Sequence, residues 1–273
     1  MLYSLMLKSM PIAMTLAGSD PSAGAGIQGD LKTFAAQGVY GVSVVTSLTA
    51  QNTFGVSDAA GVPVALVRAQ FRTLREDLPP QAAKTGMLFS AEIVVAVASL
   101  LEGSAIPLVV DPVLVSSSGF ALMEEAGLKA YREALIPLAT VLMPNLDEAA
   151  MLLGVEPITT VDGMREAARS LSKLGCGSVY MKGGHLSGSE CQDLFFVDGE
   201  FVVLSGPRVT TRNTHGTGCA LSAAMAANLA LGMGWIDAAR DAKAFVQGAL
   251  ESSRSARLGA GRGPLDHFWR MKR

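Results

Sequence analysis

The chain has few of the residues that mark disulfide-rich or zinc-binding proteins. Its 273 residues include three cysteines and three histidines. An odd number of cysteines at irregular spacing gives no disulfide framework, which favours a reducing, cytoplasmic location. No cysteines and histidines have the spacing of a zinc site. We expect Cys176 and Cys191, which fall in or beside strand-like segments, to be buried as small apolar side chains.

Long apolar runs and clusters of positive charge are also missing. No apolar stretch reaches the length of a membrane span, and Met1 to Pro11 lacks the pattern of a secretory signal peptide. The formal net charge is −2, and no basic stripe of the kind that binds nucleic acid is present. We therefore expect neither a nucleic acid nor a membrane as a partner.

What the sequence does contain is a regular alternation of strand-like and helix-like segments, in a chain that is 49% hydrophobic. The strand-like segments are 11–17, 41–48, 82–85, 107–110, 140–143 and 178–181. The helix-like segments are 25–37, 64–77, 91–101, 124–135, 146–153, 161–174, 217–231 and 237–252. This alternation predicts an α/β fold in which a mostly parallel sheet lies between two layers of helices.

One hairpin and the absence of a linker complete the predicted architecture. Residues 193–197 and 200–204, joined by Asp198-Gly199, are typical of a β-hairpin and predict an antiparallel edge. No low-complexity linker or internal repeat divides the chain, so we expect a single domain over residues 1–273.

The most informative segment is the loop Gly216-Thr217-Gly218-Cys219, which directly precedes a long helix of small residues. Backbone N–H groups at the start of a helix converge on one point, where they favour an anion such as phosphate. A cysteine in a first helical turn has its thiol pKa lowered by the helix dipole. Cys219 is therefore either a reactive thiolate or a buried structural residue.

Polar residues follow several predicted strands, and in open α/β sheets ligands bind at those ends. Asp111 either binds Mg²⁺, directly or through water, or only forms an Asp-Pro turn. Glu148 either helps to hold a hydrated metal or only completes a capping box with Asn145. Lys182 precedes two glycines and either neutralises a phosphate or lies in an ordinary loop.

A second glycine-rich loop lies at residues 24–29, with the spacing G-x-G-x-x-G. It begins several residues after the first strand, and no acidic residue ends the second strand, so a dinucleotide-binding turn is no better supported than a loop that opens a helix. Asp20 and Asp30 are candidate polar contacts there. No Walker-type G-x-x-x-x-G-K-[ST] motif is present, which excludes a P-loop kinase.

Taken in order, these segments resemble the ribokinase-like superfamily and, within it, the hydroxymethylpyrimidine/phosphomethylpyrimidine kinases of thiamine biosynthesis. The matching stretches are 17–28, 30–33, 48–53, 84–88, 111–113, 144–149, 181–185, 213–219 and 263–265. The resemblance is specific because of the number and the order of the matches. It implies a ribokinase-like three-layer α/β/α sandwich.

The resemblance also implies a role for each matching residue. The anion hole around the transferring phosphoryl group would be Gly216, Thr217, Gly218 and Cys219, with Cys219 at the position where most sugar kinases of the superfamily carry an Asp base. The substrate would be bound by Gln51, Ala25, Gly18, Met87 and Asp30. Mg²⁺ would be organised by Asp111 and Glu148, and ATP by Lys182, Asn145, Thr210 and Lys243.

The implied activity is ATP-dependent phosphorylation of 4-amino-5-hydroxymethyl-2-methylpyrimidine and then of its monophosphate, by a homodimer. One departure concerns residues 116–119, where the family often has a phosphate-contacting lysine and this chain has Ser116-Ser117-Ser118-Gly119. A pyridoxal kinase of the same superfamily is the first alternative, and a non-catalytic ligand-binding protein that keeps the pocket is the second.

Overall fold

The computed structural model describes residues 10–115, 123–184, 186 and 188–271. Three stretches named above lie outside the described residues. They are Ser116–Gly119, where the sequence departs from the family pattern, His185, and most of the segment from Met1 to Pro11. Within them, one nine-stranded sheet has the order β3-β2-β1-β4-β5-β6-β7-β8-β9. The strands are β1 (Ile12–Ser19), β2 (Tyr40–Asn52), β3 (Gly55–Gly61), β4 (Ala82–Thr85), β5 (Leu108–Val110), β6 (Val141–Leu142), β7 (Ser178–Met181), β8 (Glu190–Val197) and β9 (Glu200–Pro207).

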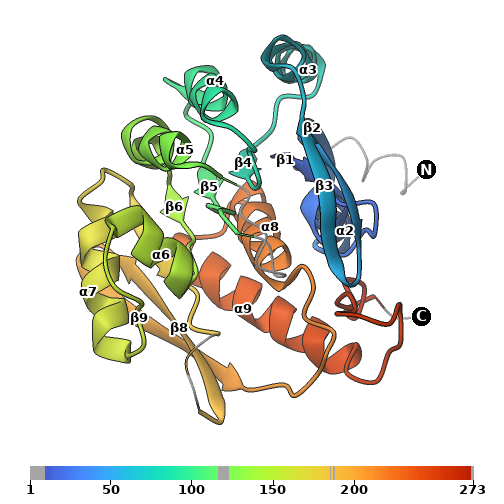
Figure 1. The fold of residues 1–273 in the computed structure, drawn as a ribbon, viewed down its shortest axis with the longest axis vertical. Coiled ribbons are helices and arrows are strands. Elements are labelled where there is room, and N and C mark those ends of the chain that lie inside the picture. Colours follow the sequence, from blue (N-terminus) through green and yellow to red (C-terminus); the bar gives the residue numbers. More distant parts are fainter. Residues whose placement is uncertain (1–9, 116–122, 185, 187, 272–273) are drawn as a thin grey trace.

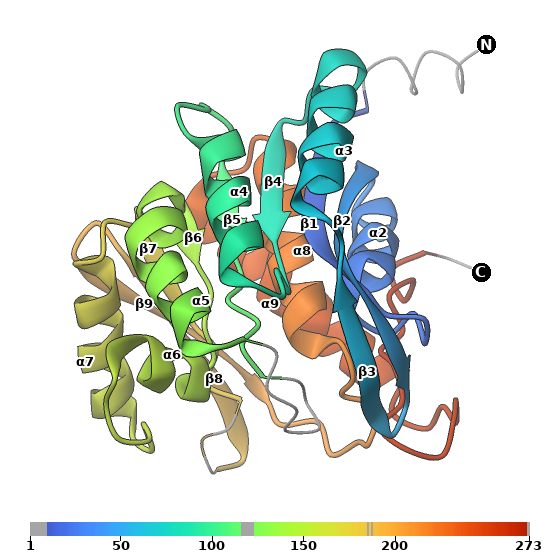
Figure 2. The same ribbon diagram turned by 45° about the horizontal axis from the view of Figure 1, so that its top comes forward.

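Helices cover both faces of this sheet, as Figures 1 and 2 show. One face carries α2 (Gly26–Ala36), α8 (Thr217–Ala230) and α9 (Trp235–Ser252). The other carries α3 (Val64–Asp77), α4 (Ala91–Leu101), α5 (Glu125–Ala130), α6 (Leu146–Leu153) and α7 (Val161–Ser172). The predicted three-layer α/β/α sandwich is therefore confirmed.

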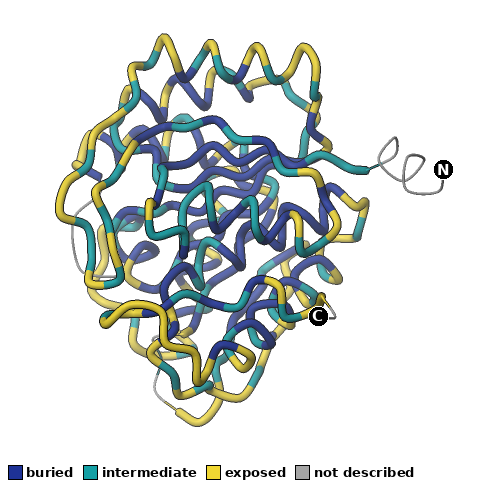
Figure 3. Tube along the Cα trace, turned by 90° about the vertical axis from the view of Figure 1, so that its right-hand side faces the viewer, coloured by how far each residue is buried: buried dark blue, intermediate teal, exposed yellow. Residues whose placement is uncertain are grey.

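Successive residues of the central strands pack into different cores. Met14 of β1 packs with the side chains beneath α3 and α4, whereas Ala13 belongs to the core beneath α2 and α8. In β5 the same alternation separates Val109 from Val110. The sheet is therefore buried on both faces, and Figure 3 shows the buried segments concentrated in the middle of the molecule.

The predicted hairpin at one edge is confirmed, but the sheet has a second antiparallel edge that the sequence did not predict. β8 pairs antiparallel with β7 and with β9. At the opposite edge, β3 pairs antiparallel with β2, which extends to Asn52 rather than ending at Leu48. The sequence of β3, Gly-Val-Ser-Asp-Ala-Ala-Gly, has little strand propensity. Pairing with β2 holds it in place.

The helix predicted over residues 124–135 is shorter and irregular. α5 ends at Ala130, and the chain continues through a π-helical turn, Tyr131–Leu135, and a 3₁₀ turn, Ile136–Leu138. Pro137 lies in this last turn, where it cannot donate a helical hydrogen bond. The wide turn lets the buried Tyr131 hydroxyl reach across to donate to the carbonyl oxygen of Gly86, at 3.3 Å.

Among the described residues, no helix combines the length and the apolar composition that crossing a membrane requires.

Candidate active site

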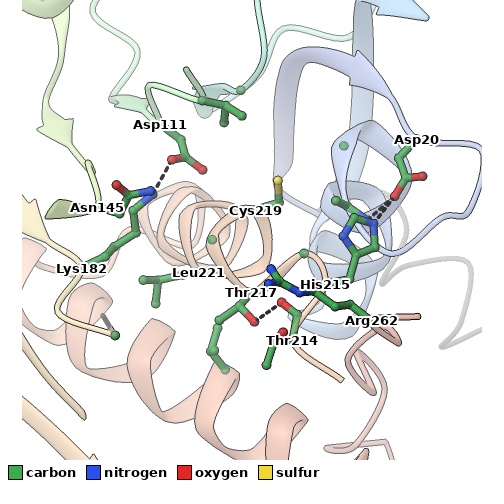
Figure 4. A pocket seen from close by; sticks show the side chains of 18 of the residues that line it. Asp20, Asp111, Asn145, Lys182, Thr214, His215, Thr217, Cys219, Leu221 and Arg262 are labelled. Atoms are coloured by element: carbon green, nitrogen blue, oxygen red, sulfur yellow. Dashed lines mark hydrogen bonds and ion pairs between the residues drawn. The ribbon is translucent and has the colours of Figure 1, made fainter. Parts of the chain in front are cut away.

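A cavity of about 1120 Å³ lies at the carboxyl ends of the parallel strands. Parallel strands end at the same edge of the sheet, so side chains that follow β1, β4, β5, β6 and β7 meet there. The N-terminus of α8 and the hairpin of β2 and β3 complete the walls. Figure 4 shows side chains from both ends of the cavity, with Cys219 between them.

The loop Gly216-Thr217-Gly218-Cys219, here named the anion loop after its predicted role, forms one wall of this cavity. Gly216 is the N-cap of α8, with φ +84°, a left-handed conformation that favours glycine. A Cβ on Gly216 would collide with the carbonyl oxygen of Gly24, so the two glycine-rich loops pack directly against each other. The hydroxyl of Thr217 donates to the carbonyl oxygen of Thr214 at 2.7 Å and closes the turn. The N–H groups of the first turn of α8 have no acceptors within the helix, and that of Thr217 donates to the carbonyl oxygen of Thr214 at 3.3 Å.

A cluster of three charged side chains lies beside this loop. The Lys182 ammonium group lies 2.8 Å from Oδ1 of Asp111 and 3.3 Å from Oε2 of Glu148. It would also lie 3.6 Å from a Cβ on Gly218, so the cation borders the anion loop itself. The second oxygen of Asp111 accepts a hydrogen bond from the Ser222 hydroxyl, one turn further along α8, at 2.8 Å.

The capping box predicted for α6 is confirmed and fixes Glu148. The side chain of Asn145 accepts from the N–H of Glu148 at 2.8 Å, while Oε2 of Glu148 accepts from the N–H of Asn145 at 2.7 Å. Glu148 therefore caps the helix, as the capping-box prediction requires, and also lies at the cavity. The same carboxylate makes the helix cap and contacts Lys182.

Burial and the neighbouring charges set the ionisation of this cluster. Burial raises the pKa of Glu148 to about 7, against the lowering effect of Lys182. Burial alone would also raise the pKa of Asp111, but Lys182 and Lys84 outweigh it and hold that pKa below its usual range. Burial works to lower the pKa of Lys182, yet the two carboxylates raise it above the ordinary lysine value. Asp111 and Lys182 are therefore an ion pair, and Glu148 is the group that titrates near neutral pH.

The expected lowering of the Cys219 pKa is wrong. Burial raises the pKa of this thiol to about 11, although the Lys84 ammonium group acts in the opposite direction. The helix dipole favours the thiolate, but desolvation of a charged sulfur outweighs it here. In the ligand-free protein Cys219 is a neutral thiol at neutral pH.

The far end of the cavity contains Gln51 and a buried histidine. Nε2 of His215 lies 2.7 Å from Oδ2 of Asp20, in the loop after β1, and 3.3 Å from Nε2 of Gln51. Cys219 lies between this end and the Lys182 cluster in Figure 4.

The structure brings most of the predicted site residues to the cavity wall. Those that line it are Gly18, Ala25, Gln51, Met87, Asp111, Asn145, Glu148, Lys182, Gly216, Thr217, Gly218, Cys219 and Lys243.

Asp30 and Thr210 do not line the cavity, which corrects their predicted placement. Asp30 lies on the face of α2 that packs on the sheet, where its carboxylate is fully buried and paired with Lys84 at 2.9 Å. Thr210 is exposed in the segment after β9, and its neighbours Val209 and Thr211 line the cavity instead.

Comparison with known proteins decides the family. The family model described as phosphomethylpyrimidine kinase matches residues 20–266. The hydroxymethylpyrimidine/phosphomethylpyrimidine kinase of Streptomyces coelicolor is 48% identical over 261 residues, which cover 96% of each chain. The Escherichia coli enzyme of the same name is 42% identical over 94% of this chain and 97% of its own. The chain belongs to the phosphomethylpyrimidine kinase family.

Solved structures similar to this family member include two kinds of kinase. An ADP complex of Bacillus subtilis pyridoxal kinase has a TM-score of 0.89 and 36% identity, over 97% of this chain and all of that one. A phosphomethylpyrimidine kinase from Clostridium difficile has a TM-score of 0.76 and 38% identity, over 86% of this chain and 97% of that one. The shared fold therefore does not separate the two activities.

Several residues at this kinase-family cavity were given no role by the sequence analysis. Lys84 and His215 line it, and Asp193 holds Lys243 by an ion pair of 2.7 Å. Cys191, expected to be buried, is half-buried and lies 3.5 Å from the same Lys243 ammonium group. The signal for Lys84 was its place in a matching stretch and within a short, otherwise uncharged strand-like segment. His215 also lies in a matching stretch, but its contact with Asp20 gave no signal because the two residues are 195 positions apart in the chain.

Proposed function

We propose that the protein transfers the γ-phosphoryl group of ATP to the hydroxymethyl oxygen of 4-amino-5-hydroxymethyl-2-methylpyrimidine, and then phosphorylates that monophosphate, in thiamine biosynthesis. The observation that carries this proposal is one cavity that Gln51, Lys182 and the anion loop all line. His215, which lies 3.3 Å from Gln51, and Lys182 lie on opposite sides of Cys219 in Figure 4. Relatives named hydroxymethylpyrimidine/phosphomethylpyrimidine kinase, at 42% to 48% identity, support the choice of substrate.

Each end of the cavity suits one substrate. Gln51, Ala25 and Met87 would hold the pyrimidine ring, with polar groups for its edge and apolar surface for its face. Lys182, Asn145 and Lys243 would bind the phosphates of ATP, beside the apolar side chains of Leu221, Val246 and Leu250. A hydroxymethyl arm that points from the first end toward the second reaches the anion loop between them.

In-line phosphoryl transfer needs alignment and charge neutralisation more than covalent help from the protein. The N–H groups at the start of α8 would stabilise the negative charge on the transferring group. The Lys182 ammonium group, which borders Gly218, would neutralise a second part of that charge. The raised pKa of Cys219 counts against a thiolate that stands ready to remove the hydroxyl proton.

The residues present fit a magnesium ion that arrives with the nucleotide. Within the described part of the chain, no group of three or more His, Cys, Asp or Glu side chains could cage a metal. Two carboxylates, Asp111 and Glu148, line the phosphate end of the cavity. Mg²⁺ in nucleotide enzymes is typically held by one or two carboxylates, substrate phosphates and water. When bound, it would offset phosphate charge.

A pyridoxal kinase activity is the second candidate, favoured by the TM-score of 0.89 to the Bacillus subtilis enzyme. Both alcohols carry a hydroxymethyl arm on a nitrogen heterocycle of similar size. The homodimeric state and the cytoplasmic location stay predictions.

The test is an assay of ADP release from ATP and Mg²⁺ with three acceptors: the hydroxymethylpyrimidine, its monophosphate and pyridoxal. We expect both pyrimidines to be phosphorylated, with a higher kcat/KM for hydroxymethylpyrimidine than for pyridoxal. A higher kcat/KM for pyridoxal would favour the second candidate. No ADP release with any acceptor would refute a kinase function.

A further inference from the structure

Two groups that can only accept hydrogen bonds flank the Gln51 side chain. One is the carbonyl oxygen of Ser19 and the other is the carboxylate of Asp20, on consecutive residues at the end of β1. Neither touches Gln51 directly. Thr49 stands between Ser19 and the Gln51 amide, and His215 stands between Asp20 and the amide.

Asp20 determines which atom of His215 carries a proton. Its carboxylate accepts hydrogen bonds from the N–H and the hydroxyl of Ser22 and from the N–H of Ala25, at 2.7–2.8 Å. Burial works to raise the pKa of Asp20, but His215 and these donors outweigh it and hold the pKa below its usual range. An ionised carboxylate 2.7 Å from Nε2 of His215 requires a proton on that nitrogen, whether the ring is neutral or charged.

The proton on Nε2 in turn selects the group that faces it. An amide NH₂ of Gln51 that points at a ring N–H places donor against donor, at the observed separation of 3.3 Å. Rotating the amide by a half-turn places its oxygen there instead. The Nε2–H group of His215 then donates a bifurcated hydrogen bond to Asp20 and to this oxygen. The oxygen and nitrogen of an amide occupy nearly the same positions, so the hydrogen-bond network decides between the two orientations.

The other side of the amide leads to the same orientation. The Thr49 hydroxyl lies 2.9 Å from the carbonyl oxygen of Ser19 and 3.2 Å from Oε1 of Gln51, the atom whose place the NH₂ takes after the half-turn. Its single proton goes to the carbonyl, which can only accept. The Thr49 oxygen is then left as an acceptor, and it requires the NH₂ of Gln51 on its side.

We infer that Asp20 and His215 on one side and Thr49 on the other fix the Gln51 amide in one orientation, and that this orientation determines which heteroaromatic ring the cavity accepts. This inference rests on the proposed function. His215 and Thr49 are positioning residues, because they act on the ring through Gln51.

The two candidate rings differ at the edge that such an amide would read. In a 4-aminopyrimidine, a ring nitrogen that accepts lies next to an amino group that donates, which matches both atoms of a correctly oriented amide, as when Asn or Gln pairs with adenine. In pyridoxal, the ring nitrogen and the hydroxyl are not adjacent, so one amide can satisfy only one of them. A fixed amide therefore favours the aminopyrimidine.

A purely structural role for His215 would give different results. The ring packs against Gly24, where a Cβ would collide with it, and the backbone N–H of His215 donates to the carbonyl oxygen of Gly263 at 3.1 Å. Loss of such packing would lower kcat/KM for every acceptor in the same proportion. Only an effect through Gln51 changes the ratio between acceptors.

The experiment measures kcat/KM, with ATP and Mg²⁺, for hydroxymethylpyrimidine and for pyridoxal. The variants are His215→Phe and Thr49→Val, with Ser22→Ala as the control that contacts Asp20 and His215 but not Gln51. We expect the first two to lower the pyrimidine-to-pyridoxal ratio about three- to tenfold, the effect of one misaligned hydrogen bond. Ser22→Ala should leave the ratio within about twofold. In a Gln51→Ala background, neither His215→Phe nor Thr49→Val should change the ratio further.

An unchanged ratio in His215→Phe and Thr49→Val would overturn the inference, as would an equal change of the ratio in the Gln51→Ala background. If His215→Phe does not fold, Thr49→Val on the half-exposed side decides the question by itself. A wild-type protein that is inactive on both acceptors would overturn the proposed function, and this inference with it. If the wild type is active but the pyrimidine-to-pyridoxal ratio is the same in His215→Phe and Thr49→Val, only the inference is overturned.

Discussion

At the scale of single residues, Cys219 illustrates how an environment changes a side chain whose position was predicted correctly. Its place at the start of α8 favours ionisation, but desolvation at this half-buried position on the cavity wall raises the thiol pKa to about 11. The neutral thiol is a weak nucleophile and a weak base. An Asp at this position, as in most sugar kinases of the superfamily, would stay mostly ionised near neutral pH even if burial raised its pKa by as much as it raises that of Cys219.

We expect the Cys219 thiol of the ligand-free protein to react slowly with iodoacetamide. A pKa about two units above the ordinary value leaves roughly a hundredfold less thiolate near neutral pH. Mass spectrometry of the Cys219 peptide should show a labelling rate that keeps rising with pH to about pH 11. Cys219→Ala controls for labelling elsewhere. A rate that levels off below pH 8 would contradict the raised thiol pKa.

Glu148 provides a second prediction at this scale. Its folded-state pKa of about 7 lies above the ordinary glutamate value of 4.5, so folding favours the protonated form. That contribution to stability is complete below the unfolded pKa and is lost as pH rises through the folded pKa. Between pH 4.5 and pH 7 the free energy of unfolding of the wild type should therefore fall relative to that of Glu148→Gln, by roughly 1–3 kcal/mol.

Glutamine suits this comparison because it resembles protonated glutamate and can still complete the capping box with Asn145. Chemical denaturation of both proteins across this pH range measures the difference. A difference that stays constant with pH would show that Glu148 does not titrate there.

At the scale of elements, the start of α8 separates two glycines with different tasks. Gly216 has φ +84° and has no room for a Cβ against Gly24, so it fixes how the two loops pack. A Cβ on Gly218 would meet Lys182 only at an ordinary 3.6 Å contact, so the absence of a side chain there leaves space beside the cation for a ligand. The motif itself does not distinguish a backbone requirement from a binding requirement.

We expect Gly216→Ala and Gly218→Ala to differ in stability. Gly216→Ala should lower the free energy of unfolding by at least about 1–3 kcal/mol through backbone strain, and lower activity with it. Gly218→Ala, within a helix, should leave stability unchanged or up to about 1 kcal/mol higher, while kcat/KM falls about tenfold or more. Denaturant titration and steady-state kinetics measure the two effects. Equal losses of stability in both variants would refute the distinction.

At the scale of the whole molecule, one buried ion pair joins elements that are far apart in the chain. Lys84 of β4 and Asp30 of α2 are 2.9 Å apart, with both side chains fully buried. The second oxygen of Asp30 accepts from the hydroxyl of Thr15 on β1 at 2.6 Å. Each charge is tolerated in the interior only because the other is present. The pair therefore fixes α2 against the sheet below the cavity.

Removing one partner should be worse than removing both. Lys84→Met leaves an uncompensated buried carboxylate and should lower the free energy of unfolding by about 3–5 kcal/mol. Lys84→Met combined with Asp30→Asn should recover a large part of that loss, because no unpaired charge remains. Thermal and chemical denaturation of the single and double variants form the cycle. A double variant as unstable as the sum of both single variants would contradict the pairing.

The sequence by itself determined the layers and most of the site. Apolar segments of strand and helix length alternate along the chain, and short-range rules placed Asp111, Asn145 and Lys182 after their strands and predicted the capping box of α6. Those features depend on neighbours within a few residues, so the sequence contains them. Only the tertiary structure decided the pairings across long separations: β3 with β2, Lys84 with Asp30, and Asp20 with His215. Burial, which no local pattern measures, kept the Cys219 thiol neutral and moved Asp30 from the cavity wall into the core.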